Sequence, residues 1–325
     1  MPLHALPTEI LCVILRFVGS QELRKHNARC LLVCKWWHAI AEPILYEDLG
    51  VSANQLLRLP RSAQGKLARH GSRLRVYASR AKDWPSSLVE DNDNLNDRLD
   101  MLLSQGACLK SFSLRTDLHF DSSLPLAPSQ HYLYNWTPAP LLNSLRASQI
   151  QDLEIDTYGS DFKHGVHICP DIARIIPSLR SLRLRMRRIC PKVLRLKHQE
   201  RGLPVRIRSI IVNISLLEPG TLSSGSSRHC ERFKSTLELF EQMVDASTAT
   251  ATHIPSLTKA RVLWHAFHSN DTLVHDCITG RSEILRPGDD SNWEDEGRPD
   301  PEEEENSNLE IASAGSNGGG GSGSG

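Results

Sequence analysis

The segment Ile176–Leu184 reads IPSLRSLRL, and its last six residues carry apolar side chains at the first, fourth and sixth positions. The same pattern begins at Ile150 (IQDLEI) and at Ile207 (IRSIIV), so the starts at residues 150, 179 and 207 are 29 and 28 residues apart. Two further segments resemble it, LKSFSL from Leu109 and IPSLTKARV over residues 254–262. A short apolar pattern that recurs at this period predicts one strand per repeat, with neighbouring repeats stacked side by side.

Helical patterns lie between these expected strands. Leucines at positions 95, 99, 102 and 103 have the spacing of one helix face, and Gly106 is suited to end that helix. Apolar residues at 233, 237, 240 and 244 have a similar spacing, and DCITG over residues 276–280 is expected to turn between two short strands. The alternation of strands and helices predicts an α/β fold with parallel strands in one sheet.

Residues 50–286 are expected to form an irregular solenoid that resembles a leucine-rich-repeat domain. The intervals from Leu109 to Ile150 and from Ile207 to Leu257 are 41 and 50 residues, too long for a regular array, so the repeats must contain insertions. The pattern LxxLxL is short, and strands of some other α/β domain are therefore the open alternative.

Arginines alternate with apolar residues directly after the central repeat. In LRLRMRR (182–188), a period of two places Arg183, Arg185 and Arg187 on the open side of the strand, opposite the leucines. Residues 171–208 hold twelve Lys/Arg and two acidic residues, so the three arginines are candidate target-binding residues for an acidic or phosphorylated partner. A solvated face, or a contact with the acidic C-terminal segment, is the alternative. Nucleic acid is an unfavoured ligand because no aromatic side chains interleave with the arginines.

The first fifty residues have a different, helical pattern. In LPTEILCVILRFVG (6–19), Pro7 and Thr8 suit a helix start and Gly19 suits a helix end. Two apolar stripes run side by side along this helix: Ile10, Val13, Ile14 and Phe17, and then Leu11, Leu15 and Val18.

The next segment, CLLVCKWWHAIAEPILYEDL (30–49), predicts a second helix from about Arg29 to Ala41, which Pro43 stops, and then a short third element. Neighbouring residues on a helix point about 100° apart, so Trp36 and Trp37 cannot share one narrow stripe. Three short helices that are apolar over so wide an arc cannot bury all of this surface against one another. The uncovered part is expected to face either the rest of the chain or a partner protein.

These two segments resemble the F-box, particularly its fungal form. The matching residues, within positions 4–49, are Leu6-Pro7, Glu9-Ile10-Leu11, Leu32-Val33-Cys34-Lys35, Trp37, Pro43 and Leu45-Tyr46. The polar run from Gln21 to Arg29 departs from the usual pattern. An F-box docks onto an adaptor of the Skp family, which links it to a cullin–RING ubiquitin ligase. The resemblance implies a non-catalytic substrate-recognition subunit, with helices in residues 1–49 that bind the adaptor and repeats that bind a target protein.

The resemblance also implies which side chains contact the adaptor, namely the apolar members of the matching motif. They are Leu6, Pro7, Ile10, Leu11, Ile14, Val33, Cys34 and Trp37. Because one face of such helices packs inward, the sequence leaves open which of the eight face the adaptor. The alternative function is a scaffold outside any ligase, which would bind an acidic or phosphorylated partner through the Arg-rich ridge.

No catalytic or cofactor-binding motif is found, whether GxGxxG, a P-loop or GxSxG. His26, Cys30, Cys34 and His38 recur at intervals of four residues. On one straight helix, however, residues i and i+8 are separated by about 12 Å of rise, so these four cannot surround one tetrahedral ion. The other cysteines form no CxxC pair. We therefore predict no enzyme activity, no cofactor and no metal site.

The composition favours a cytoplasmic or nuclear protein with a long acidic tail. Its 38 basic and 38 acidic residues balance, and eight cysteines in 325 residues lack the density of a disulfide scaffold. No signal peptide and no membrane-spanning run is expected. Between Asp289 and Glu305, ten acidic residues stand against one arginine, and the chain ends in SNGGGGSGSG. Residues 287–325 are therefore predicted to be disordered.

Overall fold

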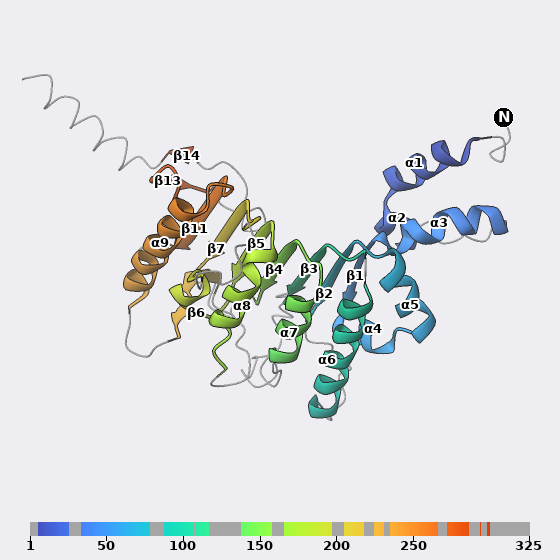
Figure 1. Ribbon diagram of the computed structural model, residues 1–325, viewed down its shortest axis with the longest axis horizontal. Helices are drawn as coiled ribbons and strands as arrows, with labels where there is room; N and C mark the ends of the chain where they lie inside the picture. Colours follow the sequence, from blue (N-terminus) through green and yellow to red (C-terminus); the bar gives the residue numbers. More distant parts are fainter. Residues whose placement is uncertain are drawn as a thin grey trace, which may run out of the picture.

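A computed structural model of the 325-residue chain describes most of the predicted helical and repeat regions (Figure 1). The described residues are 6–25, 34–78, 88–106, 108–116, 138–157, 166–196, 205–217, 224–230, 235–265, 272–285, 293 and 298–299. A group of three helices lies at one end of a long sheet, and further helices run along one side of that sheet. None of the described helices is both long enough and apolar enough to cross a membrane.

The helical module consists of α1 (Thr8–Val18), α2 (Ser20–Lys25) and α3 (Lys35–Glu47). Its own small core contains Leu11, Leu15, Leu23, Ala41 and Ile44. As expected, α1 ends at Gly19, whose φ of +82° is accessible to glycine and strained for other residues. The prediction that Pro43 stops the second helix was wrong, because α3 continues through Pro43 to Glu47. A proline inside a helix removes one backbone hydrogen bond, and here the packing of Ala41 and Ile44 on either side keeps the helix intact.

The helical module is joined directly to the sheet. The Ser20 hydroxyl donates a hydrogen bond of 2.7 Å to the Asp48 carbonyl oxygen, and Arg24 Nη2 donates one of 2.6 Å to the same oxygen. A further ion pair joins Glu42 on α3 to Lys66 on α5 (Arg61–His70). Asp48 is the first residue of β1 (Asp48–Ser52). The two hydrogen bonds to its carbonyl oxygen therefore fix α2 against the first strand of the sheet.

In the described part of the chain, the main sheet has ten strands in the order β1-β2-β3-β4-β5-β7-β11-β12-β13-β14. The seven parallel strands are β1 (Asp48–Ser52), β2 (Arg73–Tyr77), β3 (Ser111–Arg115), β4 (Asp152–Asp156), β5 (Ser181–Arg185), β7 (Ser209–Asn213) and β11 (Lys259–His265). The last three strands each pair antiparallel with the strand before them, and they are β12 (Thr272–Asp276), β13 (Arg281–Ile284) and β14 (Arg298–Pro299). The fold is thus α/β with a mixed, mostly parallel sheet whose parallel strands follow chain order.

Each of the repeated segments contributes one strand to this sheet, as the sequence predicts. Ser111, Asp152, Ser181 and Ser209 are paired in register across β3, β4, β5 and β7, and Lys259 of β11 continues the row. Each of these residues occupies the third position of its pattern or the equivalent place in IPSLTKARV. The strands β1 and β2 at the start of the sheet were not among the segments recognised from the sequence.

The large core lies between one face of the sheet and the helices that connect its strands. These helices are α4 (Ala53–Arg58), α5 (Arg61–His70), α6 (Leu88–Gln105), α7 (Ala139–Ala147), α8 (Cys169–Ile175) and α9 (Thr236–His253), with short 3-10 turns η5 (Ile176–Ser178) and η6 (Pro191–Val193). The four leucines predicted to form one face of a helix all lie on α6 and are all buried: Leu95, Leu99, Leu102 and Leu103. They meet strand residues such as Phe112, Leu153 and Leu182 in a single apolar cluster.

The buried stripe of α9 differs from the predicted one. Leu239 and Met243 are fully buried, whereas Leu237 is exposed and Phe240 is only partly buried. Phe233, the first residue of the predicted stripe, lies outside the described residues. Phe240 instead stacks on Trp264 of β11 at the edge of the core, with ring centroids 4.3 Å apart.

The C-terminal end of the sheet closes with a hairpin. As predicted, DCITG forms the turn between β12 and β13; Gly280 has a φ of +72°, and Asp276 Oδ1 accepts backbone hydrogen bonds from Ile278 and Thr279. Most of the predicted acidic tail lies outside the described residues. Within it, Trp293 is buried in a second apolar cluster with Ile211, Leu263, Val274 and Leu285, and Arg298–Pro299 pair with β13.

Candidate functional site

The two apolar stripes of α1 have opposite environments. Leu11 and Leu15 are buried in the core of the helical module, where they meet residues of α2 and α3. The adjacent stripe is uncovered by the described residues: Ile10 is 48% exposed, Val13 63%, Ile14 43% and Phe17 93%. We call these four residues, spaced at i, i+3, i+4 and i+7, the outer row. Such spacing places them on one face of the helix.

The outer row is unusual for the surface of a folded chain. Single exposed apolar residues are common in proteins, but a contiguous apolar face on one helix marks a contact surface. Among the described residues, the other large exposed apolar side chains are Trp36, Leu237 and Ile278. Trp36 belongs to α3 of the same module, whereas Leu237 and Ile278 occur singly on α9 and in the C-terminal hairpin turn.

The structure divides the eight predicted adaptor-binding residues into outward and inward groups. Pro7, Ile10, Ile14 and Cys34 are exposed, and Leu6 is partly buried. Leu11 was predicted to contact the adaptor, but it is completely buried within the module. Trp37 is partly buried against the same core, and its indole N–H has no hydrogen-bond partner among the described residues. Val33 lies outside the described residues.

Cys34 has a local structural role as well as an exposed position. It precedes the first residue of α3, and its Sγ accepts a hydrogen bond of 3.4 Å from the Trp37 backbone N–H. This contact caps the helix in the way that a serine hydroxyl does at the same position.

Val13, Phe17 and Trp36 were missed as candidate contact residues, although they are more exposed than several that were chosen. The signal for Val13 and Phe17 was present in the sequence, since they complete the i, i+3, i+4, i+7 stripe with Ile10 and Ile14. What the sequence lacked was the assignment of one stripe to the inside and the other to the outside.

The predicted Arg-rich ridge is only partly open. Arg185 is 5% exposed, and its guanidinium donates two hydrogen bonds of 2.8 Å to the carboxylate of Asp156, its register partner on β4. The same guanidinium lies over the Trp293 ring, 5.0 Å from its centroid. The expectation that Arg185 faces an open surface was therefore wrong. The alternation along a strand predicts on which face of the sheet a side chain lies, but it does not predict whether other residues cover that side chain. Arg183 and Arg187 remain partly exposed.

Acidic residues accompany the arginines along the same face of the sheet. Arg75 donates to Asp48 Oδ1 at 2.8 Å, and Arg115 Nη2 lies 2.8 Å from Glu154 Oε1. With the pair Arg185–Asp156, these contacts link β1 to β2, β3 to β4 and β4 to β5. At these three pairs the charge is locally compensated, which weakens the attraction of this part of the face for an acidic partner.

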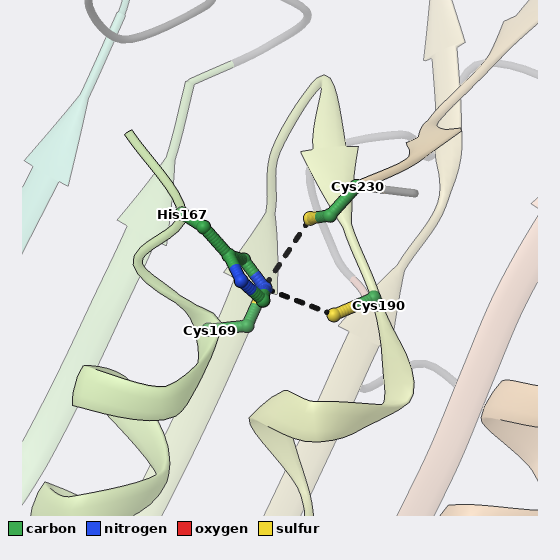
Figure 2. A group of neighbouring side chains, drawn as sticks. All are labelled: His167, Cys169, Cys190 and Cys230. Carbon is green, nitrogen blue, oxygen red and sulfur yellow. Dashed lines mark hydrogen bonds between the residues drawn. The ribbon is translucent and has the colours of Figure 1, made fainter. Parts of the chain in front are cut away.

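A group of sulfur and imidazole ligands lies at the helix side of the sheet. His167, Cys169, Cys190 and Cys230 each offer one ligand atom, and these atoms all lie within 4.8 Å of one another (Figure 2). We call these four residues the thiol cluster. It was missed at the sequence level because its members are spread over three segments, with only the pair H-x-C at 167–169 as a local signal.

The thiols of this cluster are electrostatically unequal. Hydrogen bonds from the Cys169 and Cys230 thiols lower the pKa of Cys190 to about 2, against the opposing effect of burial. The same bond to Cys190 raises the pKa of Cys169 well above its usual value, and burial raises it further. For Cys230, a hydrogen bond with Cys169 lowers the pKa, but donation to Cys190 and burial outweigh it and raise the pKa to about 12. Of the three thiols, the one of Cys190 is therefore the most readily deprotonated.

Comparison with known proteins bears on the helical module. The family model described as F-box-like matches residues 3–52, which include α1, α2, α3 and the strand β1. Among curated proteins, no match was found. The matched segment contains the four residues of the outer row and the five residues of the core of the helical module. Residues 3–52 of this chain are therefore an F-box-like domain.

Proposed function

We propose that this protein is the substrate-recognition subunit of a Skp–cullin–F-box ubiquitin ligase. The helical module would bind the Skp-family adaptor, and the sheet region would hold a target protein. The observation that carries the proposal is the outer row, an apolar helix face on an F-box-like domain that the described chain leaves uncovered. The role is non-catalytic, since it consists of bringing a target close to transfer chemistry that belongs to other subunits.

The energetics of the outer row indicate how large the adaptor contact must be. Fully burying one exposed large apolar side chain stabilises a contact by about 1.5–3 kcal/mol, so four would contribute at most roughly 6–12 kcal/mol, because three of them are already partly buried. Association costs an estimated 4–15 kcal/mol in lost freedom. The free energy gained by burying the outer row alone is therefore close to the cost of association, and stable docking requires further contacts. Pro7, Cys34 and Trp36 are exposed on the same module and are suited to supply them.

We further propose that the sheet region is a degenerate leucine-rich-repeat-like solenoid. Its support is the row of parallel strands in chain order, joined by helices and built from recurring apolar patterns. In such a solenoid the two ends of the strands and the face away from the helices are available to a target. The partial exposure of Arg183 and Arg187 keeps them as candidate target contacts, whereas the burial of Arg185 removes it.

The proposal is tested by co-elution of the purified full chain with a recombinant Skp-family adaptor in size-exclusion chromatography. Ile14→Asp places a charge in the outer row and should abolish co-elution. Leu237→Asp is the matched control, because Leu237 on α9 is 42% exposed and Ile14 is 43% exposed. The control variant should co-elute as the parent chain does.

Two results would contradict the proposal. One is the failure of the folded parent chain to bind any Skp-family adaptor. The other is unchanged co-elution of Ile14→Asp, which would show that the outer row is not the contact surface. Circular dichroism of each variant verifies that a lost complex reflects the contact and not the fold.

A further inference from the structure

We propose that His167, Cys169, Cys190 and Cys230 bind one structural zinc ion. This inference does not depend on the ligase role, and it concerns the opposite side of the molecule from the polar face of the sheet. Three cysteines and one histidine are a donor set that zinc takes in closed structural sites. Soft thiolate ligands also disfavour magnesium and calcium, which bind oxygen donors.

The fold brings these residues together from three segments. His167 and Cys169 lie at the start of α8, in the connection between β4 and β5. Cys190 follows β6 (Arg188–Ile189), and Cys230 follows β10 (Arg228–His229). Because β6 and β10 pair in parallel, with Ile189 opposite His229, the next residues of the two strands are neighbours. The pairing therefore places Cys190 beside Cys230, and the start of α8 supplies the other two ligands.

The distances suit a single tetrahedral ion. With Zn–S near 2.3 Å and Zn–N near 2.0–2.1 Å, tetrahedral geometry requires ligand atoms roughly 3.5–3.8 Å apart. The sulfurs of Cys169 and Cys230 are 3.7 Å apart, and His167 Nε2 lies 3.1 Å from Cys190 Sγ. The widest separation, within 4.8 Å, needs a contraction of only about 1 Å to reach that ideal. Figure 2 shows the four side chains converging from two sides on a common centre.

The burial of the cluster distinguishes a built site from a chance gathering of thiols. Cys169 and Cys190 are completely buried, Cys230 is partly buried and His167 is exposed. The buried sulfurs are held in place by the core, while the exposed imidazole gives the ion a path of entry. The Lys192 backbone N–H also donates a hydrogen bond to the Cys190 sulfur, which orients that ligand from outside the cluster.

The consequence of metal binding would be to tie together three connections of the sheet. Cys169 and Cys230 are 61 residues apart in the sequence, so a shared ion closes a long stretch of chain. All four positions are filled by protein atoms, which leaves no open position for a substrate or an activated water. The site would therefore act on stability, holding α8, η6 and β10 in fixed positions beneath the sheet.

The test is the metal content of the full chain, purified without chelator, measured by inductively coupled plasma mass spectrometry. About one zinc per chain is expected, because four protein ligands complete one tetrahedral ion. Cys190→Ser should lose the zinc, and Cys277→Ser should retain it. Cys277 is the matched control, because it is also a buried free cysteine but lies outside the cluster.

A second set of variants guards against loss of the fold in Cys190→Ser. His167 is exposed, so its replacement removes no core packing. With Co²⁺ bound, His167→Ala should absorb visible light less strongly than a site with four protein ligands. His167→Cys restores the fourth ligand and should recover strong absorption. Saturating zinc should raise the midpoint of thermal unfolding of the parent chain, after its metal has been removed with a chelator, by roughly 5–10 °C.

Three outcomes would overturn the proposal. The first is a parent chain that contains no zinc and gives no tetrahedral Co²⁺ spectrum on titration. The second is a zinc content that Cys190→Ser and His167→Ala leave unchanged. The third is a disulfide between Cys169 and Cys230 in the freshly purified chain, detected by mass spectrometry without reduction, because a disulfide sulfur cannot serve as a thiolate ligand.

Discussion

Helices α1 and α6 carry nearly the same apolar spacing and use it in opposite ways. On α6, Leu95, Leu99 and their two neighbours in the stripe are buried against the sheet. On α1, the outer row follows the same period, yet its members are 43–93% exposed. The difference lies in what the rest of the chain provides, because α6 packs against α4, α5 and α7 and shares the large core with the strands, whereas α1 packs on α2 and α3. An apolar stripe therefore predicts a contact, and only the fold shows whether the partner belongs to the same chain.

Ion pairs also differ between the two regions, since the sheet holds a buried pair and the helical module an exposed one. Breaking the buried pair gives the largest expected effect on stability. Asp156→Ala removes the carboxylate that pairs with the buried Arg185 guanidinium, and the free energy of unfolding should fall by about 3–5 kcal/mol. Glu47→Ala is the control in the helical module, where the pair Arg16–Glu47 is well exposed. That change should cost no more than about 1 kcal/mol. Urea denaturation measures both, and a similar cost for the two variants would contradict the assigned burial.

The leucine stripe of α6 gives the next largest effect. Leu99→Ala removes a fully buried side chain and should lower the free energy of unfolding by about 2–5 kcal/mol. Ile14→Ala in the outer row should change it by less than about 1 kcal/mol, since much of that side chain is exposed already. Equal losses in chemical denaturation would mean that the outer row is covered by part of the chain and is not a free surface.

Much of the fold follows from short patterns in the sequence, for reasons that are local. Strands β3, β4, β5 and β7 were predicted because each repeats two inward apolar residues separated by one residue, and this alternation is a property of the strand itself. The leucines of α6 were predicted because their period belongs to the helix. The continuation of α3 through Pro43 was not predictable in this way, because it depends on packing against α1 and α2.

The candidate sites were less predictable because they depend on contacts between distant segments. The burial of Arg185 depends on Asp156, 29 residues away, and on Trp293, which lies in a segment predicted to be disordered. The thiol cluster depends on the pairing of β6 with β10, two strands of two residues each, which have no recognisable pattern. For the helical module, the resemblance identified the surface, but the structure was needed to separate Leu11 from Ile10 and Ile14.

Phe17 allows the most direct test of the central claim, because it is the most exposed large apolar residue among those described, at 93%. Isothermal titration calorimetry of the full chain with a Skp-family adaptor should show that Phe17→Ala weakens binding by about tenfold or more, as expected for an aromatic residue buried at an interface. The midpoint of thermal unfolding of the free chain should not change, since Phe17 contributes little to the module core. An unchanged dissociation constant for Phe17→Ala would contradict the claim that the outer row of α1 is the adaptor-binding surface.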